Sequence, residues 1–375
     1  MPGIYIHIPF CKQKCYYCNF FSVASSKYRN VFLESLLNEI SARKDYLTGK
    51  NINTVYFGGG TPSLLNHNEI NKIISLIEKL FDLSPRAEIT LEANPDDLTP
   101  GYLKKLKENT RINRLSIGVQ SFFDDDLKYL HRLHNSKKAR SAIETALVTG
   151  FKNITIDLIY GIPTLTPDKW EKNLGIFFSY NLPHLSSYAL TVEPGTALKV
   201  FIDKKTTPAV SEDDTVNHFE TLINETKKHN FIHYEISNFA KEGFYSKHNS
   251  IYWLGGHYLG VGPSAHSFNG ISRQWNVSNL KKYVTSAKVE KIIEEKEILS
   301  QNDLYNEYVM TSLRTVWGCN TEHIENVFGK KHRLYFQNKI ETFISGGMIK
   351  KSGTVYSLTA KGKLFADRIA SGLFI

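Results

Sequence analysis

The stretch Tyr5-Ile-His-Ile-Pro-Phe-Cys-Lys-Gln-Lys-Cys-Tyr-Tyr-Cys-Asn-Phe-Phe21 places three of the four cysteines of the chain directly after an apolar strand pattern. Three thiolates so close together suit a soft metal centre such as zinc, Cu(I) or an iron–sulfur cluster. A disulfide framework is not indicated, because the chain is long and its cysteines are clustered. A structural zinc site would need a second pair of Cys or His ligands, which does not follow; zinc and inert buried thiols stay open as alternatives. A cubane cluster would use Cys11, Cys15 and Cys18 and leave one iron open to a non-protein ligand.

Strand and helix patterns alternate along the chain after this stretch. Short apolar runs bounded by turn residues predict strands at 3–9, 54–57, 87–93, 115–120, 154–159 and 185–190. Helical spacing predicts a first helix over 26–47, and Thr99-Pro100, Thr166-Pro167 and Ser211 are N-terminal capping signals for later ones. Six strand–helix units in succession predict a parallel sheet with right-handed crossovers, most simply a partial (β/α)6 barrel in the α/β class.

Polar or glycine-rich residues stand at the end of each predicted strand. In barrels of this kind the chemistry gathers at the C-terminal ends of the strands. A single one of these residues would be read as a turn or a helix cap, but their joint placement predicts one ligand site. The residues are the cysteine loop, the glycines at 58–60 with Thr61, Glu92, Asn94, Gln120, Asp157 and Tyr188.

The motif Cys-x3-Cys-x2-Cys after a strand resembles the radical S-adenosylmethionine (SAM) superfamily. Further motifs resemble its oxygen-independent coproporphyrinogen III oxidase group: Gly58-Gly-Gly-Thr-Pro-Ser63, Leu91-Glu-Ala-Asn-Pro-Asp96, Leu115-Ser-Ile-Gly-Val-Gln-Ser-Phe122 and Ile156-Asp-Leu-Ile-Tyr-Gly-Ile-Pro163. The resemblance implies a [4Fe-4S] cluster on Cys11, Cys15 and Cys18, with SAM on the open iron and a 5'-deoxyadenosyl radical after its reductive cleavage.

The same resemblance implies the residues of the SAM site. Glu92 would take the ammonium group of SAM, Gln120 and Asp157 its ribose hydroxyls, and Arg132 its carboxylate, which agrees with the hydrogen-bonding capacity of these side chains. For Arg132 an exposed ion pair on a helix surface stays open. The other residues implied are Tyr5, Tyr17, Gly59, Gly60, Thr61 and Ala189.

Two features distinguish the chain within that group. Phe20 stands where the oxidases carry a further cysteine, and residues 248–253 read His-Asn-Ser-Ile-Tyr-Trp. Both features resemble the HemW heme chaperones, which implies heme binding and transfer to acceptor proteins, with no coproporphyrinogen oxidase activity. The resemblance implies heme contacts from His248, Asn249, Tyr252 and Trp253. A histidine that simply packs with aromatics against an extra strand at 234–237 is equally compatible.

A glycine-rich loop at 255–266 carries His257 and His266, which are alternative heme ligands. Residues 281–297 mix five lysines with four glutamates, which predicts a solvated connecting helix. Helices at 303–314, 322–328 and 334–345 and a ribbon at 348–358 resemble a winged helix. We therefore expect a barrel at 1–230, a heme-associated extension at 231–297 and a C-terminal domain at 298–375. Cys319 is expected to be an ordinary thiol, with a heme-thiolate role left open.

The composition limits the location and the partners. The 375 residues include no apolar run near the roughly 20 residues of a membrane span and no signal pattern, so a cytoplasmic protein is expected. The net charge of +9 favours anionic partners, such as porphyrin carboxylates or a membrane surface. Expected partners are heme, heme-acceptor proteins, including ones at the membrane, and an electron donor for the cluster.

Several functional questions stay open at this stage. No catalytic residue is assigned, and the sequence leaves open whether SAM is cleaved and whether the chain forms a homodimer. Oxidative decarboxylation of coproporphyrinogen is the enzymatic alternative. A regulator that binds nucleic acid through the C-terminal domain is a further one, although the basic patch there is more typical of a solvated face and no nucleic acid is expected.

Overall fold

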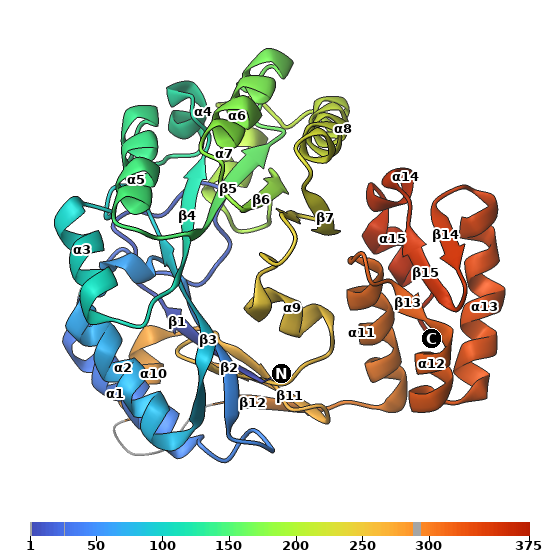
Figure 1. The fold of residues 1–375 in the computed structure, drawn as a ribbon, viewed down its shortest axis with the longest axis horizontal. Coiled ribbons are helices and arrows are strands. Elements are labelled where there is room, and N and C mark those ends of the chain that lie inside the picture. The colour runs from blue at the N-terminus through green and yellow to red at the C-terminus, as the bar shows by residue number, and fades with distance from the viewer. Residues whose placement is uncertain (1, 26, 288–293) are drawn as a thin grey trace.

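Six parallel strands form the centre of the computed structural model, which describes residues 2–25, 27–287 and 294–375 (Figure 1). They lie side by side in chain order, each paired with the next. The predicted partial (β/α)6 barrel is therefore confirmed, with strands that are mostly longer than expected. The strands are β1 (Gly3–Ile8), β2 (Asn51–Gly59), β3 (Asp82–Ala93), β4 (Arg114–Gln120), β5 (Asn153–Tyr160) and β6 (His184–Ala189).

Helices follow the strands as predicted. The hydroxyls of Thr99, Thr166 and Ser211 each accept a hydrogen bond from a backbone amide three residues on, which confirms them as N-caps. The first helix is shorter than the expected 26–47, since it ends at Ala42, and Ser26 lies outside the described residues. The helices are α1 (Arg29–Ala42), α2 (His67–Leu80), α3 (Pro100–Asn109), α4 (Asp124–Tyr129), α5 (Ser136–Val148), α6 (Pro167–Ser179), α7 (Ala197–Asp203) and α8 (Glu212–Lys228).

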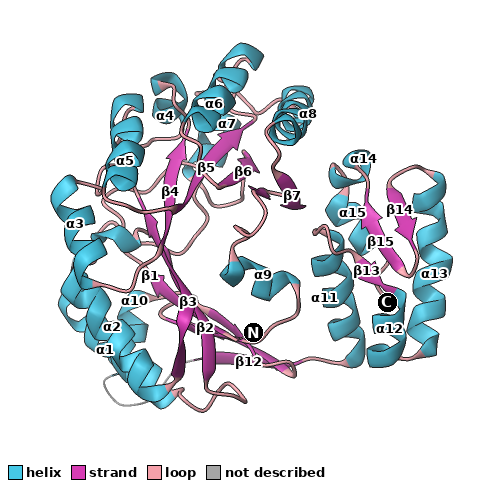
Figure 2. Cartoon of the chain, in the orientation of Figure 1, coloured by secondary structure: helices cyan, strands magenta, loops and turns pink. Residues whose placement is uncertain are grey.

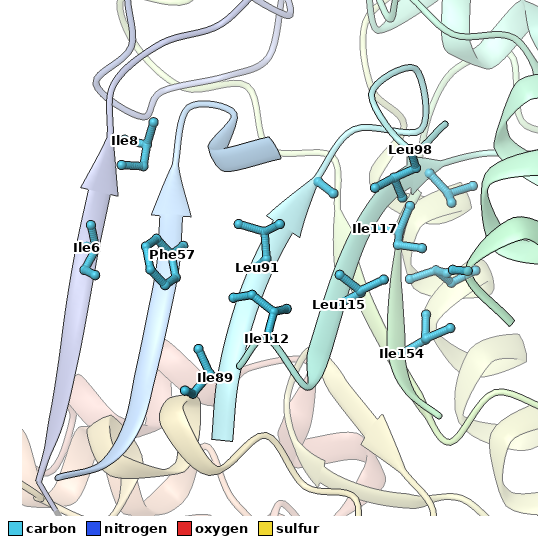
Figure 3. Close-up of a cluster of buried hydrophobic side chains, with 14 of the residues drawn as sticks. Ile6, Ile8, Phe57, Ile89, Leu91, Leu98, Ile112, Leu115, Ile117 and Ile154 are labelled. Carbon is cyan, nitrogen blue, oxygen red and sulfur yellow. The ribbon is translucent and has the colours of Figure 1, made fainter. Parts of the chain in front are cut away.

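The main hydrophobic core lies between these strands and the helices outside them. Successive side chains of a strand point to opposite faces of the sheet. In β1, Ile6 and Ile8 join the core, with Phe57, Leu91 and Leu115 from the next strands (Figure 3). The alternate residues of each strand therefore face the inside of the barrel.

The sheet extends beyond the six predicted strands at both edges, to twelve strands among the described residues. Beyond β6 the expected strand at 234–237 is the end and turn of a hairpin, β7 (Ile232–Glu235) and β8 (Asn238–Ala240). Beyond β1 the expected loop at 255–266 contains β9 (Tyr258–Val261), which pairs in parallel with β1. Residues 258–261 lie in a glycine-rich stretch and show no strand pattern in the sequence. Their pairing partner β1 is more than 200 residues away, so no local signal marks them as a strand.

The connecting helix expected over 281–297 is wrong in its second half. Helix α10 (Leu280–Ala287) is followed by β12 (Glu294–Ile298), which pairs with β11 (Ser272–Asn276) next to β10 (His266–Phe268). Residues 288–293 lie outside the described residues. Glu295, Lys296 and Glu297 of β12 are exposed at a sheet edge, so the strand has no apolar alternation to reveal it.

The C-terminal part forms its own core beside the barrel (Figure 2). The predicted helices and the ribbon that turns at Gly353 are confirmed, whereas the division at 230 and 297 stays a prediction. Cys319 is fully buried there, and burial raises the pKa of its thiol, as expected for an ordinary cysteine. The elements are α11 (Gln301–Leu313), β13 (Cys319–Asn320), α12 (Thr321–Phe328), α13 (Lys330–Ser345), β14 (Ile349–Ser352), β15 (Val355–Leu358), α14 (Ala360–Lys363) and α15 (Ala366–Ser371).

Helix α9 (Lys247–Trp253) lies inside the arc of the strands, on the side that faces the C-terminal part (Figure 1). It contacts β2 and α11. Two backbone hydrogen bonds, from Ile236 to Arg314 and from Val316 to Tyr234, also join the extension to the C-terminal part. Within the described ranges, no helix combines the length and the apolar character needed to cross a bilayer.

Candidate functional site

A cavity of about 650 Å³ opens at the C-terminal ends of the parallel strands, and we call it the strand-end cavity. Almost every residue expected at the SAM and cluster sites lines it. The exception is Tyr5, which lies one layer deeper and stacks on Tyr56, 6.1 Å between ring centres. The expected residues in its lining are Cys11, Cys15, Tyr17, Cys18, Gly59, Gly60, Thr61, Glu92, Gln120, Arg132, Asp157 and Ala189.

The cysteine loop is fastened to the barrel on both sides. Thr61 Oγ1 lies 3.4 Å from Cys11 Sγ, and Arg132 Nη1 lies 3.3 Å from Cys15 Sγ. The three thiols are free and half-buried. Within the described part of the chain, no group of three His, Cys, Asp or Glu side chains is arranged to hold one metal ion. A cubane cluster takes each thiolate on a different iron, so this donor set fits it.

Two glycines let the end of β2 pass against this loop. A Cβ on Gly59, which has a φ of +108°, would lie 2.7 Å from the ring of His7. A Cβ on Gly60 would lie 2.7 Å from the carbonyl oxygen of Phe10 and 3.1 Å from Cys11 Sγ. Any side chain at either position would displace the cysteine loop or the ring beneath it.

Two half-buried carboxyl groups face the strand-end cavity. Glu92 accepts hydrogen bonds from Tyr56 Oη at 2.8 Å and from the amide of Gly59 at 3.2 Å, and Asp157 accepts one from Ser116 Oγ at 3.4 Å. Burial raises the pKa of each carboxyl group to about 7. No described basic side chain forms a salt bridge with either one. The pair therefore fits a ligand that brings cationic or hydroxyl donors, as the ammonium and ribose of SAM would.

Arg132 and Gln120 are held in the same cavity by unusual local structure. Gln120 has a φ of 69°, next to an irregularity in the pairing of β4 with β5, which turns the chain at the strand end. Arg132 Nη2 donates to Asn94 Oδ1 at 2.6 Å and to the carbonyl of Gly118 at 2.7 Å, and its Nε has no partner. The alternative of an exposed helix-surface ion pair for Arg132 is wrong, because the guanidinium lies among the cavity residues.

The four residues expected to contact heme lie away from this cavity, on α9. His248 is 1% exposed, with Nδ1 2.7 Å from Thr54 Oγ1 and Nε2 2.9 Å from Tyr252 Oη. Trp253 packs under the guanidinium of Arg314, 5.5 Å from the ring centre, and Asn249 contributes its amide to the N-cap of α9. Both ring nitrogens of His248 are thus engaged, and its role as heme ligand stays a prediction that requires one of these bonds to break.

The alternative histidines lie nearer the surface. His266 is exposed and stacks on Trp275, 5.9 Å between ring centres. His257 is half-buried, and its carbonyl oxygen accepts a hydrogen bond from the amide of Gly3 at 3.1 Å. Neither lines the strand-end cavity.

The structure adds cavity residues that the sequence analysis did not assign to the site. Ser116 and Gly118 line it, and their alternation with Gln120 along β4 was the available signal. Phe20, which is 69% exposed, stands at its rim with Tyr188, a strand-end residue that the sequence analysis did assign, which is 42% exposed. These rings give the cavity an apolar entrance.

Comparison with known proteins identifies relatives along nearly the whole chain. Residues 5–175 match the Radical SAM superfamily and residues 299–365 the HemN C-terminal domain. Curated relatives include "Heme chaperone HemW" of Bacillus subtilis (strain 168), 32% identical over 98% of both chains. The protein of the same name from Lactococcus lactis subsp. lactis (strain IL1403) is 33% identical over 96% of this chain and 93% of its own.

A solved structure supports the fold independently. "Coproporphyrinogen III oxidase (HemN) from Escherichia coli is a Radical SAM enzyme" superposes with a TM-score of 0.84 at 23% identity, covering 100% of this chain and 90% of that chain. The likeness spans the barrel, the extension and the C-terminal part together. At this level of sequence identity, the likeness shows a shared fold and nothing further.

Proposed function

The chain belongs to the HemW family, and on this premise we propose that it is a heme chaperone, which binds heme and passes it to acceptor proteins. The observation that carries the proposal is the match to relatives named heme chaperone over 96% to 98% of the chain. The match includes the extension and the C-terminal part as well as the barrel. A shared barrel alone would not carry a function, because one fold hosts many activities.

We propose that Cys11, Cys15 and Cys18 hold a [4Fe-4S] cluster and that SAM binds beside it, since a radical SAM domain uses both. When bound, the cluster would supply the electron for reductive cleavage of SAM. The chain itself supplies binding and orientation. The backbone at Gly59 and Gly60 leaves room next to the cysteine loop, and Glu92 and Asp157 supply acceptors for donor groups.

Other residues of the strand-end cavity complete this proposed site. Arg132 would bind the carboxylate of SAM through its forked guanidinium, with Gln120 as a partner for the ribose. Tyr17, Thr61 and Ala189 line the same space. Tyr5 would act from below, through its stacking on Tyr56.

The coproporphyrinogen oxidase alternative is not favoured. Phe20 is exposed at the rim of the strand-end cavity, at the position where the oxidases carry a cysteine. Formation of protoporphyrinogen in repeated turnovers by reduced, cluster-loaded protein would contradict the chaperone proposal.

Heme contact through α9 is the residue-level part of the proposal. His248 would reach iron only after it gives up its hydrogen bond to Thr54 or to Tyr252, so heme binding would require α9 to shift. Hemin titration of the purified protein tests this, with stoichiometric binding and a Soret band expected. The matched control is His229→Ala, which removes an exposed histidine at the end of α8.

In the titration we expect His248→Ala to lose or alter the Soret spectrum and His229→Ala to keep it. An unchanged spectrum in folded His248→Ala protein would contradict the assignment of His248. Absence of hemin binding by the unaltered protein would contradict the function itself.

The remaining parts of the proposal concern place and partners. We propose that the protein works in the cytoplasm, where thiols stay reduced, with an electron donor for the cluster. The net charge of +9 supports heme delivery at an anionic membrane surface. Self-association into a homodimer is tested by the mass of the cluster-loaded protein in light scattering.

A further inference from the structure

Arg114, the first residue of β4, is a buried cation. It is 1% exposed, and its Nε has no hydrogen-bond partner. The guanidinium acts electrostatically on Glu92, Asp157, His184, Tyr234 and His248. A buried charge is costly, so the group needs an explanation in the charges around it.

The strand geometry places this side chain beneath the strand-end cavity. Along β4, Ser116, Gly118 and Gln120 line the cavity, whereas Leu115 lies in the core on the helix side. Because side chains alternate along a strand, Arg114 faces the inside of the barrel, one step below Ser116.

Ser116 links this position to the carboxyl groups of Glu92 and Asp157. It pairs in register with Glu92 of β3, and its hydroxyl donates to Asp157 of β5 at 3.4 Å. Arg114 itself pairs in register with Thr90, whose Oγ1 is also buried and unpaired. The guanidinium therefore lies below the two carboxyl groups, close enough for electrostatic influence and without a salt bridge to either.

Arg114 acts on both carboxyl groups of the strand-end cavity. Burial raises the pKa of Glu92 and of Asp157 to about 7, and Arg114 opposes this effect at both sites. Arg132 opposes it at Asp157, but its guanidinium already donates to Asn94 and to a carbonyl. The other titratable groups that face the pair are Tyr5 of β1, Tyr56 of β2, Tyr17 of the cysteine loop and Tyr188 of β6, with His248 of α9 stacked on Tyr56 and His184 of β6 near Arg114. Tyr234 of β7 also lies near Arg114, and the buried carboxyl groups of Glu88 of β3 and Glu235 of β7 lie near Tyr234.

We infer that Arg114 is a positioning residue of the ligand site, which holds Glu92 and Asp157 as carboxylates through space so that the strand-end cavity receives a cationic ligand at neutral pH. The inference rests on the proposed binding of SAM in this cavity. Arg114 acts without touching the ligand, since it does not line the cavity. A salt bridge to one carboxylate would occupy the acceptor that the ligand needs.

The inference gives a specific pH signature for Arg114→Met. Without the guanidinium the carboxylates are harder to ionise, so the pH at which SAM binding is half lost should rise by about 1 unit. Well above that pH both carboxylates are ionised in either protein. There the variant should bind SAM at least as tightly, because a positive charge near a cationic ligand has been removed. A residue that only supports the fold would weaken binding at every pH.

The test is SAM affinity of cluster-loaded protein between about pH 6 and about pH 9, measured by anaerobic equilibrium dialysis. Arg114→Lys keeps the charge and should restore the original midpoint. Arg111→Met is the matched control, since Arg111 contacts Glu78 and the carbonyl of Ser84 and does not line the strand-end cavity.

The possible failures are distinguishable. If the unaltered protein binds SAM and Arg114→Met shows the same pH profile, the inference is overturned and the proposed function stands. If the unaltered protein binds no SAM at any pH, the proposed SAM site is overturned and the inference with it. If Arg114→Met does not fold, Arg114→Lys and Arg114→Gln carry the comparison: equal midpoints overturn the inference, and a higher midpoint for Gln supports it.

Discussion

Replacing Gly60 by alanine tests whether the cysteine loop depends on the close approach of β2. The new Cβ would lie 2.7 Å from the carbonyl oxygen of Phe10, 3.0 Å from that of Ile8 and 3.1 Å from Cys11 Sγ. Two of these neighbours are backbone atoms, so relief requires movement of the loop itself. Overpacking of this kind costs about 1–3 kcal/mol. We expect Gly60→Ala to lower the thermal midpoint of unfolding by a few degrees and to displace Cys11.

The decisive measurement is the iron and sulfide content after anaerobic reconstitution, together with the unfolding midpoint. Displacement of Cys11 should lower the cluster content well below that of the unaltered protein. Gly101→Ala is the matched control, because it lies at the start of α3 and a Cβ there meets no atom within 4 Å. That variant should be as stable as the original or more stable, by up to about 1 kcal/mol. Full cluster content and an unchanged midpoint in Gly60→Ala would refute the steric reasoning.

Three further predictions follow from the buried polar groups. Burial raises the pKa of Glu92 from 4.5 to about 7, so the ligand-free protein loses stability as the pH rises through this range. Glu92→Gln should therefore raise the unfolding midpoint of ligand-free protein at about pH 8 and leave it unchanged at about pH 4, and the opposite pattern would disprove the assignment. His248→Ala leaves two buried hydroxyl partners without a hydrogen bond and should destabilise the protein by about 2–4 kcal/mol in chemical denaturation, whereas a loss below about 0.5 kcal/mol would show that α9 is not fastened by this side chain. Arg314→Ala removes the salt bridge to buried Glu235 and the contact with Trp253, so limited proteolysis should release the C-terminal part faster; an unchanged rate would show that backbone pairing alone holds it.

Helix α9 is fastened to the same strands that end at the proposed SAM site. The carboxylate of Glu88 of β3 accepts hydrogen bonds from the amides of Lys247 and His248 at the start of the helix. The hydroxyl of Thr54 of β2 is hydrogen-bonded to the ring of His248. The ring of Tyr56 lies between His248, 5.0 Å away, and Glu92, to which its hydroxyl donates. A displacement of His248 would therefore affect Glu92 through Tyr56, and a change at Glu92 would affect His248.

The sequence by itself determined the repeating part of the fold. Helix caps such as Thr99 and Thr166 and the apolar alternation of β1 are local signals, each contained within a few residues. The rule that strand ends meet at one face then predicted the residues of the strand-end cavity, because in a parallel barrel that meeting follows from the topology.

Only the tertiary structure decided what depends on distant partners. Strand β9 forms by pairing with the free edge of β1, and β12 forms by pairing with the edge of β11. No local sequence pattern therefore marks either strand. The burial of His248 with both nitrogens engaged, and of Arg114 with its Nε unpaired, depends on which side chains fill the inside of the barrel. Hydrogen-bond partners and electrostatic surroundings are properties of neighbours in space, and for these groups the neighbours come from five or more separate segments of the chain.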